Sequence, residues 1–232
     1  MATSGTATFD LDLNEITEEA FERCGSELRT GYDLRTARRS LNLLFADWAN
    51  RGINMWTIEQ GQHVLTQGTA TYTLPADTVD LIEHVIRTGA GNASTQADLQ
   101  ITRISVSTYS SIPNKLQQAR PIQVWIQRGQ AQPSFTVWPV PDGSQTYTFV
   151  YWRLRRIQDA GEGGVYTQDI PFRFLNCLVA GLAYYLSMKL PGATERMPVL
   201  KAQYDEAWEL ASTEDREKAA VRFVPRQQFI GG

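Results

Sequence analysis

Hydrophobic residues recur at helical spacing near both ends of the chain and alternate with polar residues in the middle. Apolar positions three and four residues apart are typical of helices with one buried face, and strict alternation is typical of strands. Residues 1–55 and 170–221 therefore predict helices, and residues 56–157 predict strands.

Four helices are expected. The first begins near Asp12, which can cap it together with Glu15 three residues later. The second ends at Gly52. The third starts after Asp169, and its residues from 174 to 188 are apolar nearly all round, which predicts a helix inside a bundle. The second helix has an apolar face formed by Leu34, Ala37, Leu41, Leu44, Phe45 and Trp48, and a polar face formed by Arg35, Arg38, Arg39, Asn42 and Asp47. The fourth presents Leu200, Tyr204, Ala207, Trp208 and Ala211 on one face.

The middle of the chain alternates with a period of two and is interrupted by turn residues. Strands are expected at residues 69–74, 79–87, 99–104, 121–127, 134–138 and 146–155. They follow one another directly, so the sheet should be mostly antiparallel. The last strand is apolar on both faces and should be central. A short helical turn is expected within residues 105–113, and all six tryptophans occupy positions that predict burial.

Together these patterns predict an α+β fold: an antiparallel bundle of about four helices with an inserted, mostly antiparallel β domain. The expected divisions are a flexible N-terminal arm (1–11), the first half of the helical domain (12–55), the β domain (56–157), the second half of the helical domain (158–218) and an extended C-terminal arm (219–232).

Composition excludes several classes of protein. The 232 residues carry 22 basic and 25 acidic side chains, so the net charge is −3 and there is no global positive excess to attract nucleic acid. The 42% of apolar residues excludes a disordered chain. Cys24 and Cys177 are too few for a disulfide framework and are expected to be buried thiols. The longest apolar stretch is shorter than the ~20 residues that cross a bilayer, so no membrane partner is expected.

Motifs for catalysis or metal binding are absent from the sequence. The segment that begins at Asp10 resembles an EF-hand loop, but Glu15 stands where glycine is needed and Phe21 where glutamate is needed. His63 and His84 lie on different predicted strands without other ligands at metal spacing. No nucleophile elbow, phosphate loop or zinc-protease motif occurs. The sequence therefore predicts no enzyme, no cofactor and no metal.

One basic cluster stands out at the end of the last predicted strand. Arg153 and Arg155 share a face of that strand, and Arg156 follows. These arginines are candidates for a subunit interface or for a surface that faces DNA. The alternative is pairing with acidic residues of a neighbouring subunit or domain.

The order of several short motifs resembles a known family. These motifs are Leu41-Asn42-Leu43-Leu44, Trp48-Ala49-Asn50-Arg51-Gly52, Tyr72-Thr73-Leu74-Pro75, Arg120-Pro121, Val137-Trp138-Pro139-Val140-Pro141-Asp142, Tyr151-Trp152 and Leu178-x-x-Gly181-Leu182-Ala183. Over about residues 12–215 the chain is similar to the head-to-tail adaptor proteins of short-tailed bacteriophages, the tail accessory factor or tubular tail protein A group.

That resemblance implies a structural virion protein at the head–tail junction, assembled in the host cytoplasm. It implies a homo-dodecameric ring bound to the portal protein, with the tail nozzle (tubular tail protein B) docked onto it. Double-stranded genome DNA would pass through the lumen during ejection. Two other classes stay open: a cell-wall-degrading or glycan-binding tail component, and a DNA-binding regulator.

The C-terminal arm is the expected portal-binding segment. It combines apolar and basic residues without a period, and Pro225 blocks a continued helix. Aromatic and arginine side chains anchor many interfaces, and the resemblance implies that the C-terminal segment reaches the portal. The candidate contact residues are Arg222, Phe223, Val224, Arg226, Phe229 and Ile230.

Overall fold

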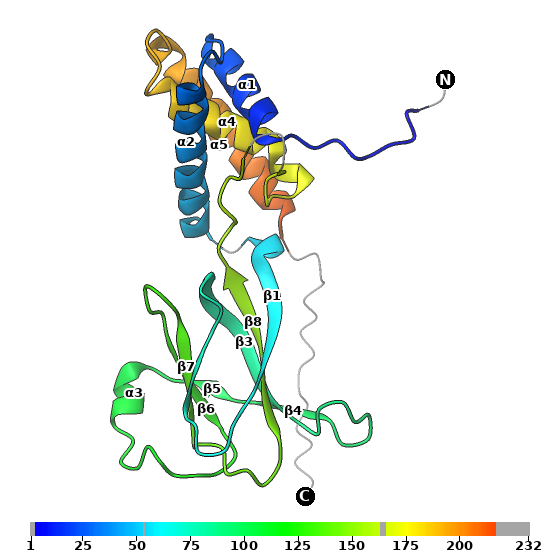
Figure 1. The fold of residues 1–232 in the computed structure, drawn as a ribbon, viewed down its shortest axis with the longest axis vertical. Coiled ribbons are helices and arrows are strands. Elements are labelled where there is room, and N and C mark those ends of the chain that lie inside the picture. Colours follow the sequence, from blue (N-terminus) through cyan, green and yellow to red (C-terminus); the bar gives the residue numbers. More distant parts are fainter. Residues whose placement is uncertain (1–2, 53, 163–165, 217–232) are drawn as a thin grey trace, which may run out of the picture.

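The computed structural model describes residues 3–52, 54–162 and 166–216. Figure 1 shows a helical domain at one end of an elongated molecule and a β domain at the other. The first and last described helices both belong to the helical domain, and the β domain is inserted between the second and third helices of that domain. The expected α+β fold is therefore confirmed. The C-terminal arm and its six candidate contact residues lie outside the described residues.

Four helices form the bundle: α1 (Leu13–Cys24), α2 (Gly31–Asn50), α4 (Leu175–Ser187) and α5 (Met197–Glu214). Two single turns, η2 (Phe172–Phe174) and η3 (Thr194–Arg196), lead into α4 and α5. The capping box at the start of α1 is confirmed: the Asp12 carboxylate accepts from the Glu15 amide at 2.9 Å, and the Glu15 carboxylate accepts from the Asp12 amide at 2.9 Å.

Helix α4 is the centre of the bundle and contacts α1, α2 and α5. Its Gly181 lets α2 and α5 approach closely, because an added Cβ would lie 2.9 Å from both Leu44 and Tyr204. The second helix keeps one face in solvent, where Tyr32 is 67% exposed and Leu43 is 54% exposed. The bundle is therefore built around α4 alone, with α2 on its outside.

The β domain contains two four-stranded sheets. The first has the order β1-β8-β3-β4 and the second β2-β7-β6-β5. The strands are β1 (Ile58–Val64), β2 (Thr71–Thr73), β3 (Thr78–Thr88), β4 (Ala97–Gln100), β5 (Thr102–Arg103), β6 (Gln123–Gln127), β7 (Ser134–Trp138) and β8 (Tyr147–Arg155). The 3-10 turn η1 (Met55–Thr57) leads into β1, and the short helix α3 (Val106–Ser110) lies where a helical turn is expected. All pairings are antiparallel except that of β5 with β6.

The last strand, β8, is central, as its two apolar faces predict. The expected strand at 99–104 is wrong in detail. The chain passes from one sheet to the other at Ile101, so β4 pairs with β3 and β5 pairs with β6. Ile101 packs against the core of the β domain, which explains why the segment keeps an apolar pattern across the break.

Each domain has its own hydrophobic core. One core lies within the bundle and the other between the two sheets. Both cysteines are buried free thiols, as expected. The expectation for the tryptophans is too strong, because only Trp48 is fully buried and the other five are partly exposed.

Candidate functional site

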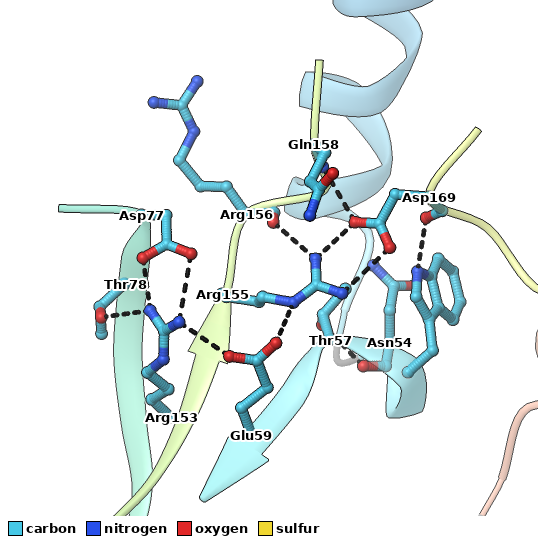
Figure 2. Close-up of polar contacts among 11 residues, drawn as sticks. Asn54, Thr57, Glu59, Asp77, Thr78, Arg153, Arg155, Arg156, Gln158 and Asp169 are labelled. Atoms are coloured by element: carbon cyan, nitrogen blue, oxygen red, sulfur yellow. Dashed lines mark hydrogen bonds and ion pairs between the residues drawn. The ribbon is translucent and has the colours of Figure 1, made fainter. Parts of the chain in front are cut away.

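The arginines of β8 lie at the junction of the two domains, at the end of the strand from which the chain continues to the bundle (Figure 2). Because β1 pairs antiparallel with β8 and Glu59 stands opposite Arg153, the Glu59 carboxylate lies between Arg153 and Arg155. It accepts from Arg153 Nη2 at 2.8 Å and from Arg155 Nε at 2.7 Å. This carboxylate thus binds both guanidinium groups of the strand face.

Arg153 is paired within the β domain. Its guanidinium binds the Asp77 carboxylate, with Nη2 at 3.2 Å from Oδ2, and donates to Thr78 Oγ1 at 3.0 Å. The hydrogen bond from Arg153 holds the pKa of Asp77 below its usual range, although burial acts in the opposite direction. Only 11% of the Arg153 side chain is exposed, so its contacts are better shielded from solvent than an ordinary surface pair.

Arg155 connects the β domain to the helical domain. Its guanidinium forms a bidentate pair with Asp169, which lies just before η2, with Nη2 at 3.0 Å from Oδ1. The same carboxylate accepts from the backbone amide of Gln158 at 3.0 Å, and the Asp169 carbonyl accepts from Trp56 Nε1 at 3.1 Å. The pair with Asp169 and the bond to Glu59 raise the pKa of Arg155. Both segments that join the domains are therefore fastened at one residue, Asp169.

Further contacts hold the same junction from the helical side. Asp215, at the end of α5, accepts from the Met55 amide at 2.9 Å and binds Arg173. Asn42 on α2 accepts from the Ala160 amide at 2.8 Å. With these bonds on both connecting segments, the structure fixes the position of one domain relative to the other.

Arg156 differs from its two neighbours. Figure 2 shows its side chain pointing away from the network. Among the described residues, its guanidinium has no hydrogen bond or ion pair, and the residue is exposed. The structure thus brings Arg153 and Arg155 together with internal carboxylates and leaves Arg156 at the surface. The pairing of Arg155 with Asp169 matches the alternative in which these arginines meet acids of a neighbouring domain.

Sequence reasoning missed the acidic partners in this network. Glu59 and Arg155 are 96 residues apart, and Arg153 and Asp77 are 76 apart. Their pairing depends on the strand register, for which the sequence carries no local signal. The sequence places His63 on a strand but gives no bounds for β1, because the residues of this strand are mostly polar and do not alternate clearly.

Catalytic geometry is not apparent in the described part of the chain. One hollow of the bundle is lined by four carboxylates, and all of them project from α1: Glu15, Glu18, Glu19 and Glu22. A glycoside hydrolase needs two carboxylates on opposite sides of a bound sugar. His63 and His84 lie on β1 and β3, which are separated by β8. No group of three or more metal-ligand side chains occurs among the described residues. None of the described helices has the length and apolarity that crossing a membrane requires.

Comparison with known proteins assigns the chain to a family. No curated protein matches it. The family model described as SU10 adaptor protein matches residues 11–226, which include both domains and the whole junction. This match supports a structural head–tail adaptor of phages, which is the broader part of the resemblance noted from the motifs. The chain belongs to the SU10 adaptor protein family.

Proposed function

We propose that this protein is the head-to-tail adaptor that joins the portal to the tail nozzle as a homo-dodecameric ring. In this role it belongs to the virion, is assembled in the host cytoplasm and lets double-stranded DNA pass through the lumen of the ring. Membership of the adaptor family supports the role. The short-tailed type of virion and the tubular tail protein A group follow from the motif resemblance alone.

The observation that carries this proposal is the fastened junction between two domains with separate hydrophobic cores. A connector must bind one component at each end and keep the two in register. The two cores lie at opposite ends of the molecule (Figure 1), and Arg155 with Asp169 fastens the segments between them. A flexible linker at this place would allow relative motion of the domains, whereas this network restricts it.

The C-terminal arm is the proposed portal anchor. Its apolar and basic side chains supply anchors of the kind found at interface centres, and a segment that orders on binding is suited to a surface met only during assembly. Removal of residues 219–232 should leave the melting temperature unchanged and abolish portal attachment. In the full-length chain, Arg222→Ala/Arg226→Ala tests whether the positive charges of the arm contribute to portal attachment. The control is Lys201→Ala, which removes a positive charge from the exposed face of α5.

The arginine cluster keeps a more limited role in the assembly. Arg153 and Arg155 are occupied by internal carboxylates, so we assign them to holding the junction. Arg156 is exposed and remains the member that can contact a neighbouring subunit or face DNA.

Native mass spectrometry of the full chain, with and without purified portal rings, tests the proposed function. The expected result is monomer or weak oligomers alone, and twelve copies per portal ring in the mixture. Mass action then couples ring closure to portal binding. A stable dodecamer without portal would contradict the templated assembly, and absence of any portal complex would contradict the adaptor role.

A further inference from the structure

A groove runs across the bundle between α1 and α5, with α4 as its floor. Two adjoining hollows of about 450 Å³ each form it, and both are lined by Arg23 and Asn176. Its floor contains apolar side chains such as Leu175 and Val179. The groove is therefore lined by three helices and by Phe9 and Leu11 of the N-terminal segment, and it is apolar at its base.

The walls of the groove are strongly acidic. Five glutamates line it, against the single arginine Arg23: Glu15, Glu18, Glu19, Glu22 and Glu206. Arg23 is already paired with Glu19 at 2.9 Å. Glu18 and Glu22 are exposed and form no side-chain hydrogen bond or ion pair with the described residues. The groove thus presents uncompensated negative charge around an apolar floor.

The outer face of α2 has the complementary character. Tyr32, Arg35, Arg39 and Leu43 are exposed and follow one another at helical spacing, so at about 100° per residue they fall within about 80° of arc. We call these four residues the α2 stripe. Most described arginines have an internal partner, but the guanidinium groups of Arg35 and Arg39 form no hydrogen bond or ion pair with the described residues. Burial, and after it the positive charge of nearby Arg39, lowers the pKa of Lys189.

These two surfaces lie on different sides of the bundle. Leu44, on the buried face of α2, packs against Gly181 of α4. Asn176 and Ala180 of α4 line the groove instead, on another side of that helix. One copy therefore cannot bring its own α2 stripe to its own groove. Two complementary surfaces at separate places on one subunit are what a head-to-tail contact requires, and such contacts form a ring when the rotation from one copy to the next closes.

We infer that the α2 stripe of one copy docks in the acidic groove of the next copy. The apolar ends of the stripe, Tyr32 and Leu43, supply contact area, and Arg35 and Arg39 face the free glutamates of α1. This is a helix-in-groove contact in which opposite charges fix the partner's orientation. The inference rests on the proposed ring and names the surfaces that would form it.

Disulfide trapping in the full chain tests the contact without portal. A Glu18→Cys/Arg35→Cys variant carries one accessible thiol on each surface, while the native Cys24 and Cys177 are buried. Mild oxidation should give a ladder of covalent multimers, because each copy can bond to two others. The control Glu18→Cys/Arg128→Cys moves the second thiol to an exposed arginine position of the β domain. If the multimers are neither larger nor more abundant than those of the control, the inference is overturned.

Charge reversal gives a second measurement. A mixture of Glu18→Cys copies and Arg35→Cys copies should form mixed disulfide dimers. Adding Arg39→Glu to the Arg35→Cys copy should reduce their yield to that of a control mixture of Glu18→Cys and Arg128→Cys copies, and adding Glu22→Lys to the Glu18→Cys copy should restore it. Failure of Glu22→Lys to restore the yield would show that these charges do not meet. Disulfide trapping without portal binding would support the contact and contradict the adaptor role. Portal binding without trapping would support the adaptor role and contradict the contact.

Discussion

Replacing Asp169 by asparagine should weaken the junction between the two domains. The substitution keeps the size of the side chain and one acceptor oxygen but removes its charge. The Asp169 carboxylate binds Arg155 through both oxygens and also accepts from the Gln158 amide. Two of these three bonds join it to a guanidinium that is only 11% exposed.

The size of the effect follows from burial. Removal of one partner from a fully buried ion pair costs about 3–5 kcal/mol, whereas an exposed pair contributes about 0–1 kcal/mol. The Asp169 side chain is 19% exposed, so the pair lies between these limits. Arg155 also keeps its bond to Glu59 and is not left unpaired. We expect a loss of about 2 kcal/mol, which lowers the melting temperature of a chain of this size by about 4–8 °C.

Thermal unfolding followed by tryptophan fluorescence measures this loss, since the Trp56 indole donates to the Asp169 carbonyl. Asp98→Asn is the matched control. Asp98 also forms two hydrogen bonds to one arginine, Arg87, at 2.7 and 2.8 Å, but it lies on an exposed hairpin. Removal of the Asp98 charge should therefore leave the melting temperature nearly unchanged. If Asp169→Asn shifts the melting temperature no more than Asp98→Asn does, the junction does not depend on this pair.

Three further predictions concern the cores. Leu182→Asp places a charge at a position with 0% exposure and should lower the free energy of unfolding by more than about 4 kcal/mol. The control Leu116→Asp, at a 78% exposed position, should melt like the parent protein. A normally melting Leu182→Asp variant would contradict the central place of α4. Burial raises the thiol pKa of Cys24 to about 11 and that of Cys177 to about 12, so a thiol reagent at pH 8 should label neither in the native protein and both in denaturant. Burial lowers the pKa of His84, whose ring nitrogens have no partner among the described residues. The unfolded chain therefore binds more protons than the folded chain, and the free energy of unfolding should fall as the pH drops below about 6.5. His84→Phe should remove this part of the pH dependence, as measured by urea titrations at several pH values.

Features encoded within a few residues could be predicted from the sequence. The capping box of Asp12 and Glu15 depends on a spacing of three residues, and the structure confirms it. The central position of β8 follows from its apolar residues on both faces, which need cover on two sides. In these cases the physical cause lies within one helix or strand.

Features that depend on pairing between distant segments could not be predicted. The sequence places Arg153 and Arg155 on one strand face, but their partners are set by the register of β1 against β8 and by the return of the chain before η2. The break at Ile101 was missed because one apolar residue serves the core while the strands on either side join different sheets. Local alternation records that a residue is buried and does not record which neighbour covers it.

The character of the proposed ring contact agrees with the proposed assembly on the portal. The α2 stripe offers two apolar side chains and two arginines that are solvated in the free chain, so each contact gains little beyond the cost of ordering long side chains. A single contact between two free copies is then weak. On a portal, bound copies would be neighbours at high effective concentration, and the last copy of the proposed ring would make two contacts at once. Contacts of this kind are too weak to hold free copies together, but because they fix orientation they would still give a closed ring once the copies are held side by side.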